Sequence, residues 1–166
     1  MKQSERLRRM TVLALLFALA MIFSFVESRL PTFIPIPGVK LGLCNVVVIL
    51  ALLRYGPLSA AAVSLLRVLL SSILFGNMAA FFYSLAGAVL SLLVMALLKK
   101  TGRFSPVGIS VSGGVFHNVG QILMAWLILG TEGVLLYLPV LIIAGTIAGA
   151  LIGLAAAYIH KRTDIG

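Results

Sequence analysis

Carboxylates are scarce in this chain of 166 residues, which has four acidic side chains against 13 lysines and arginines. The acids are Glu5, Glu27, Glu132 and Asp164. A single aspartate cannot form the pair that holds Mg²⁺ and a diphosphate, and the chain offers no catalytic carboxylate dyad. A glycine-rich phosphate loop ending in Lys-Ser or Lys-Thr is also missing. The sequence therefore argues against an enzyme, and any ATP would have to be bound by another chain.

Cysteine, histidine and overall charge are equally limited. The one cysteine, Cys44, excludes an internal disulfide, and the two histidines, His117 and His160, are too far apart to suggest a metal site. Charged residues make up 10% of the chain, compared with about 25% in soluble domains. The net charge of +9 comes from small basic groups between apolar runs, unlike the basic stripe of a nucleic-acid-binding face. We expect no metal, no cofactor and no nucleic-acid partner.

Long apolar runs dominate what is present, since hydrophobic residues make up 61% of the chain. A transmembrane helix needs about 20 residues, so the length leaves room for about six spans in the lipid bilayer. The sequence predicts an all-α integral membrane protein: a single domain over residues 1–166 that forms a six-transmembrane-helix bundle. The expected helices cover residues 10–28, 41–54, 58–75, 78–98, 107–129 and 134–159.

A proline-rich segment, residues 29–40, precedes the second expected helix. Pro31, Pro35 and Pro37 cannot propagate a regular helix. The segment is either a surface loop or a lid over a cavity, because irregular backbone at membrane depth must be surrounded by protein or water. The short helix after it would reach only about 21 Å. It must be tilted into protein, begin below the membrane surface, or be completed by this segment.

The distribution of basic residues predicts the orientation in the membrane. With a cytoplasmic N-terminus, most lysines and arginines lie on the cytoplasmic side, and only Arg29 and Lys40 lie in outer loops. This bias follows the positive-inside rule. Both termini should therefore be cytoplasmic.

Polar residues inside two expected spans are the main functional signal. His117, Asn118 and Gln121 share one helix face, which serves either as a polar clamp between helices or as a ligand-contacting face. Arg67 falls near the middle of its span and should face the bundle interior. Its partner is either Glu27 or a bound anion.

Further polar groups lie toward the expected outer half of the membrane. They are Lys40 and Asn45 near the second helix, and Tyr83 with Ser84 on the fourth. With Arg67 and the three residues of the fifth helix they suggest one outward-facing pocket. The alternatives for each are hydrogen bonding in the core or an interfacial position.

Small residues recur at four-residue spacing in two expected helices. They are Gly145, Gly149, Gly153 and Ala157 in the last helix, and Ala14 and Ala18 in the first. Such stripes let membrane helices approach closely. The stripe in the last helix is a contact face, either within the monomer or for another subunit.

The runs "IPGVKLGLCN", "SLLR", "YSLAG" and "HNVGQ", within a similarity that covers nearly the whole chain, carry a family resemblance. The chain resembles the prokaryotic membrane family called heptaprenyl diphosphate synthase component I, also called the Gx transporter family. That family is similar to the S components of energy-coupling factor (ECF) transporters. These are six-helix proteins that capture a small-molecule substrate and dock onto a transmembrane scaffold driven by two ATPase subunits.

The resemblance implies a noncatalytic, substrate-binding S component in the plasma membrane, with a substrate linked to isoprenoid or quinone metabolism. Ala14 and Ala18 match the scaffold-docking motif, and residues 29–40 correspond to the lid. The pocket is expected to comprise Lys40, Asn45, Arg67, Tyr83, His117, Asn118 and Gln121. The alternative is a noncatalytic membrane subunit associated with a prenyl diphosphate synthase.

Overall fold

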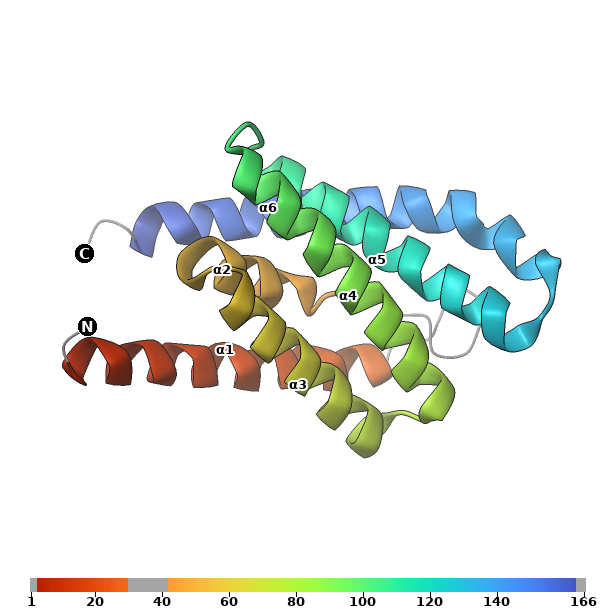
Figure 1. Cartoon of the computed structure of the whole chain (residues 1–166), viewed down its shortest axis with the longest axis horizontal. Helices are drawn as coiled ribbons and strands as arrows, with labels where there is room; N and C mark the ends of the chain where they lie inside the picture. The colour runs from red at the N-terminus through yellow and green to blue at the C-terminus, as the bar shows by residue number, and fades with distance from the viewer. Residues whose placement is uncertain (1–2, 30–41, 164–166) are drawn as a thin grey trace.

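The computed structural model describes residues 3–29 and 42–163, and every regular element in these ranges is helical, as predicted. In chain order they are α1 (Gln3–Arg29), α2 (Asn45–Tyr55), α3 (Pro57–Phe75), α4 (Met78–Thr101), α5 (Pro106–Leu129), the 3₁₀ helix η1 (Glu132–Tyr137) and α6 (Leu138–Thr163). Figure 1 shows an elongated bundle in which α1 begins and α6 ends at the same end. The predicted lid, residues 29–40, lies outside the described ranges except for Arg29, which ends α1.

Five elements are long and apolar enough to cross a membrane: α1, α3, α4, α5 and the stretch Glu132–Ile159. The remaining helix, α2, has 11 residues, which at 1.5 Å per residue reach about 16 Å, roughly half the thickness of the hydrocarbon core. Its first residue, Asn45, is buried, and Figure 1 shows α2 only in the half of the bundle where α1 begins. The described residues thus form five helices long enough to span a membrane and one short, largely buried helix, and the expected count of six membrane-spanning helices is not confirmed.

Local signals define the ends of α4 and α5. Asn77 Oδ1 accepts a hydrogen bond of 2.8 Å from the Ala80 amide at the start of α4. Gly102 ends the same helix in the left-handed region, with φ 66°. Ser105 Oγ accepts a 3.2 Å bond from the Gly108 amide, and proline follows it at the first helical position. Both helices consequently lie within a few residues of the predicted ranges.

The first helix begins earlier than expected, at Gln3 rather than near residue 10. The stretch "SERLRR" is polar, so an apolar pattern does not detect it, but its residues are mostly good helix formers. These turns are largely exposed. They extend α1 beyond the apolar region of the bundle.

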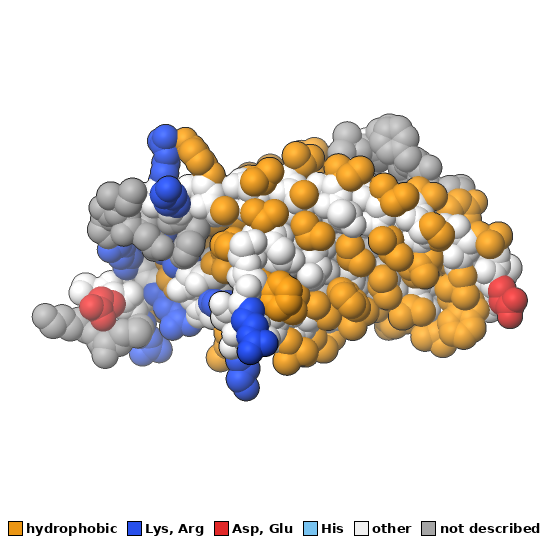
Figure 2. All heavy atoms as spheres, turned by 90° about the horizontal axis from the view of Figure 1, so that it is seen from above, with side chains coloured by type: hydrophobic (Ala, Val, Ile, Leu, Met, Phe, Trp, Pro, Cys, Tyr) orange, Lys and Arg blue, Asp and Glu red, His pale blue; other side chains and the backbone are white. Residues whose placement is uncertain are grey.

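The outer surface is apolar along most of its length. Leu58 and Leu136 are 82% and 80% exposed, and many other leucines, isoleucines and phenylalanines are exposed as well. Figure 2 shows this apolar surface on one face, with lysines and arginines gathered at the end where α1 begins and α6 ends. Five long apolar helices with such a surface indicate a multi-pass membrane protein.

Glycines bring α5 into close contact with helices on two sides. A Cβ atom on Gly120 would lie 2.7 Å from the Ala86 carbonyl oxygen of α4. On the other side, a Cβ on Gly149 of α6 would lie 2.7 Å from Val111 Cα. Gly145 and Gly153 approach the α5 backbone in the same way. The glycine stripe of α6 is therefore an internal contact with α5, which is the first of the two interpretations given above.

Candidate functional site

Buried polar side chains from three spanning helices meet around the start of α2. We call this set the polar layer; each member is at most 7% exposed. It comprises Glu27 of α1, Cys44 and Asn45 at the start of α2, Arg67 of α3, and His117, Asn118 and Gln121 of α5.

Glu27 attaches the start of α2 to the end of α1. Its Oε1 accepts a 2.8 Å hydrogen bond from the Leu43 amide. Its Oε2 accepts a 3.5 Å bond from the Cys44 thiol, which also lies 3.1 Å from Ser24 Oγ. Both carboxylate oxygens of Glu27 are therefore used to position the chain where α2 begins.

Arg67 lies on the inner face of α3, with Ser64 and Ser71 one turn away on either side. It is only 3% exposed. Its guanidinium is close enough to act electrostatically on the Cys44 thiol. Nevertheless, among the residues that the structure describes, Nε has no hydrogen-bond partner and no carboxylate lies within ion-pair distance. The direct Arg67–Glu27 ion pair, one of the two alternatives from the sequence, is not formed.

His117 and Gln121 pack against a glycine of α4. A Cβ atom on Gly87 would lie 2.7 Å from the His117 carbonyl oxygen and 2.9 Å from Gln121 Cγ. On another side of His117, a Cβ on Gly42 would lie 3.5 Å from His117 Cδ2 and 3.0 Å from Asn45 Nδ2. The structure therefore brings Asn45 and His117 together across Gly42, whose φ of 82° favours glycine.

The three polar residues of α5 differ in what they contact. Asn118 Nδ2 donates a 2.7 Å hydrogen bond to the Leu141 carbonyl of α6, so this nitrogen forms an interhelical clamp. Within the described ranges, Asn118 Oδ1 and both amide atoms of Gln121 have no hydrogen-bond partner, and Gln121 is fully buried. Leaving a buried polar group unpaired costs about 1–3 kcal/mol. These atoms therefore have unused hydrogen-bonding capacity within the described structure.

The other residues predicted from the sequence are Tyr83, Lys40, Ala14 and Ala18. Tyr83 is buried in an apolar cluster with Ile122, Ala125, Val134 and Leu141, one helical turn before Gly87. Lys40 lies outside the described ranges. Ala14 and Ala18 are exposed on α1.

Two members of the local network, Ser24 and Cys44, were not predicted as site residues. Ser24 is three residues before Glu27, so both lie on one face of α1, and this spacing is the signal that could have indicated it. Cys44 carries no such signal, because a cysteine in an apolar run is usually a small buried hydrophobe.

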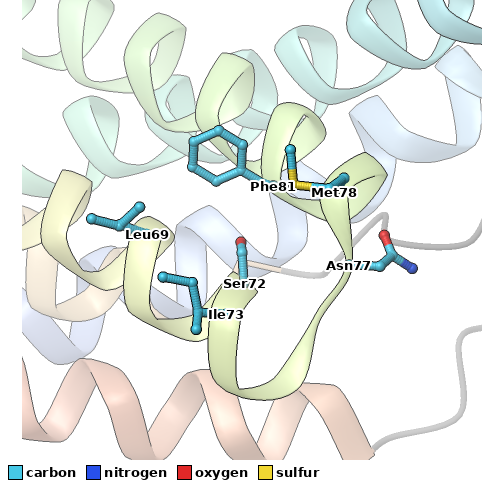
Figure 3. Close-up of a pocket in the computed structure, with 6 residues that line it drawn as sticks. All are labelled: Leu69, Ser72, Ile73, Asn77, Met78 and Phe81. Carbon is cyan, nitrogen blue, oxygen red and sulfur yellow. The ribbon is translucent and has the colours of Figure 1, made fainter.

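A separate groove opens between α3 and α4, with a volume of about 340 Å³. Figure 3 shows its six lining residues, Leu69, Ser72, Ile73, Asn77, Met78 and Phe81. Four of them are apolar and none is charged, and Asn77 already caps α4. The residues that line this groove include no cation to bind an anion, unlike the polar layer.

The chemistry available in the polar layer is recognition. Arg67 supplies a buried positive charge, and the amides supply hydrogen bonds of both kinds. In the described part of the chain, no three His, Cys, Asp or Glu side chains come together as they would to hold a metal ion.

The family model described as heptaprenyl diphosphate synthase component I matches residues 16–159. The chain belongs to this family. The match includes the whole polar layer and confirms the resemblance seen in the sequence. No curated protein and no solved structure matches the chain. The name of the heptaprenyl diphosphate synthase component I family links this membrane protein to that synthase, as one component of it.

Proposed function

We propose that this chain captures a small anionic or amphipathic metabolite in the polar layer, as the substrate-binding S component of an ECF-type importer. The observation that supports this most directly is Arg67, which is buried and has no ion-pair partner among the described residues. Placing an arginine at the centre of a membrane helix costs about 2.5–3.5 kcal/mol. A bound anion would offset that cost.

The other polar groups would orient the ligand once its acidic group meets Arg67. Asn45 and His117 lie together beside Gly42, and Gln121 lies next to His117 on Gly87. The sequence adds Lys40 and Tyr83 to this pocket as proposals. The family name favours a substrate linked to isoprenoid or quinone metabolism.

Docking to a scaffold would use the exposed face of α1. Ala14 and Ala18 are exposed there, and a groove of about 220 Å³ opens beside Ala14. Its other walls include Ser59 and Ala62 of α3, so small residues line both sides. A scaffold helix can approach closely at such a surface. The basic end of the bundle would face the cytoplasm of a prokaryotic cell and the two ATPase subunits.

The test of capture is ligand-induced thermal stabilisation of the purified protein in lipid nanodiscs. We expect aromatic carboxylates or prenyl phosphates to raise the melting temperature of the wild type, and Arg67→Gln to weaken the response at least about tenfold in ligand concentration. Arg103→Gln, which removes an exposed arginine, is the matched control and should respond like the wild type. An equal response from Arg67→Gln and wild type would contradict the proposal.

A second candidate is favoured by the family name: a noncatalytic membrane subunit that holds a prenyl diphosphate synthase at the membrane. Affinity purification from the native membrane separates the two. An S component should copurify with a transmembrane scaffold and ATPases. The Ala14→Leu, Ala18→Leu double variant should no longer copurify with them. Copurification with a soluble synthase alone would favour the second candidate.

A further inference from the structure

Charge in the buried part of the described structure is balanced. Among the residues that the structure describes, Arg67 and Glu27 are the only buried side chains of the Lys, Arg, Asp and Glu types. Both act electrostatically on the Cys44 thiol, so both charges lie in the same region of the bundle. The charges of Arg67 and Glu27 sum to zero. Multiple uncompensated charges are costly at low dielectric, so this environment accommodates one added negative charge better than several.

A diphosphate group is therefore a poor match for the polar layer. It carries more than one negative charge, and phosphate groups in proteins are usually met by several cations or by Mg²⁺. Among the residues that the structure describes, a single buried guanidinium would face that charge, and Glu27 reduces the attraction. A carboxylate, with one negative charge and planar geometry, suits a single arginine.

Gln121 places a second requirement on the chemistry of the ligand. Its side chain is fully buried, and neither the amide nitrogen nor the amide oxygen has a hydrogen-bond partner in the described part of the chain. A primary amide presents a donor beside an acceptor, which pairs with a ligand edge carrying the complementary acceptor and donor. Glutamine reads such edges on nucleobases. Asn118 Oδ1, on the same face of α5, is a further unpaired acceptor.

We infer that the ligand of the polar layer is a monoanion whose apolar body carries a lactam- or carboxamide-like edge, with its carboxylate at Arg67 and that edge at Gln121. This inference rests on the proposed capture function and specifies its substrate class. It excludes a prenyl diphosphate as the preferred ligand, although the family is named after a synthase that makes one.

The experiment compares three probes on the nanodisc-embedded protein by calorimetry: 2-naphthoate, a quinolinone carboxylate that adds a lactam to a similar ring system, and geranyl diphosphate. We expect the quinolinone carboxylate to bind wild type about tenfold more tightly than naphthoate, because it pairs both amide atoms of Gln121. Gln121→Leu should remove this difference and leave naphthoate binding unchanged.

Two further measurements separate ligand recognition from a structural role. Gln121→Leu should raise the melting temperature of the ligand-free protein, because it replaces unpaired polar atoms with an apolar side chain of similar size. Glu27→Gln keeps an oxygen for the Leu43 amide but removes the negative charge. It should increase the affinity for geranyl diphosphate more than the affinity for either carboxylate.

The binding and melting measurements distinguish failure of the inferred ligand class from failure of the capture function. Tighter binding of geranyl diphosphate than of both carboxylates by wild type overturns the inference but leaves capture standing. A lactam preference that persists in Gln121→Leu, or a lower melting temperature of that ligand-free variant, also overturns it. Binding of none of the three probes counts against both the inference and the proposed function.

Discussion

Gly87 shows how one missing side chain shapes the polar layer. Because it has no Cβ, α4 approaches α5 closely enough for His117 and Gln121 to lie directly against its backbone. The same close approach encloses their polar groups. The residue that sets the geometry of the candidate site is therefore not itself polar.

We predict that Gly87→Ala destabilises the protein and impairs ligand binding. The new Cβ would lie 2.7 Å from the His117 carbonyl oxygen, so α4 and α5 must separate. Overpacking of this kind costs about 1–3 kcal/mol. Thermal unfolding followed by circular dichroism measures the effect. The control is Gly108→Ala, where the nearest atom is 3.6 Å away and the melting temperature should be unchanged or higher.

Some of the site could be predicted from the sequence at the level of residues. Helical spacing places His117, Asn118 and Gln121 on one face, and the cost of exposing arginine to lipid places Arg67 inside. The partners could not be predicted. Asn118 donates to Leu141 because glycine contacts fix the rotation of α5 against α6. Arg67 and Glu27 stay apart because the start of α2 occupies the carboxylate.

The C-terminal end of α2 is held by hydrogen bonds from basic side chains of two other helices. Lys99 Nζ of α4 donates to the Leu52 and Leu53 carbonyls at 2.5 and 3.0 Å. Arg9 of α1 donates to the Tyr55 carbonyl at 3.5 Å. Positive charge is favourable at a helix C-terminus, where carbonyls lack helical partners. These contacts fix the short helix that presents Asn45 to the polar layer.

Lys99→Met is expected to destabilise the protein by about 1.5–3 kcal/mol, since it removes charged hydrogen bonds and leaves two carbonyls unpaired. Thermal unfolding in nanodiscs provides the measurement. Lys100→Met removes the same charge from an exposed neighbouring position and should change the melting temperature little. Equal effects of the two substitutions would show that stability depends on the loss of a positive charge and not on the contacts of Lys99 with α2.

How well each helix could be predicted depends on its signals. Proline, serine, asparagine and glycine mark the ends of α4 and α5, so their boundaries followed closely from the sequence. The beginning of α1 did not, because hydropathy carries no information about polar helical turns. The short length of α2 was expected, but its burial depends on contacts with α3 and α6 that a local pattern does not encode.

The contact between α5 and α6 gives a prediction for the glycine stripe. In Gly149→Leu the side chain would meet the α5 backbone at Val111 and Ser110, so we expect the melting temperature to fall by several degrees and the purified protein to aggregate. Thr146→Leu places the same side chain on the exposed face of α6 and is the control. A normally stable Gly149→Leu variant that failed only to bind another subunit would instead support the docking interpretation.

Across the whole molecule, exposed charged side chains and exposed apolar side chains occupy different parts of its length (Figure 2). The exposed apolar surface lies between a basic end, where α1 begins and α6 ends, and an opposite end, where η1 connects α5 to α6 (Figure 1 and Figure 2). The direction in which the bundle inserts is then set by the basic residues.

We predict that the basic end faces the cytoplasm, and cysteine labelling of intact cells can test this. Wild type should stay unlabelled by a membrane-impermeant maleimide, because its one cysteine, Cys44, is 1% exposed. Glu132→Cys should react in intact cells, whereas Lys100→Cys should react only after permeabilisation. Both positions are exposed at opposite ends of the bundle, so accessibility to the reagent differs only by the side of the membrane. Labelling of Lys100→Cys alone in intact cells would reverse the orientation and move the start of α1 outside.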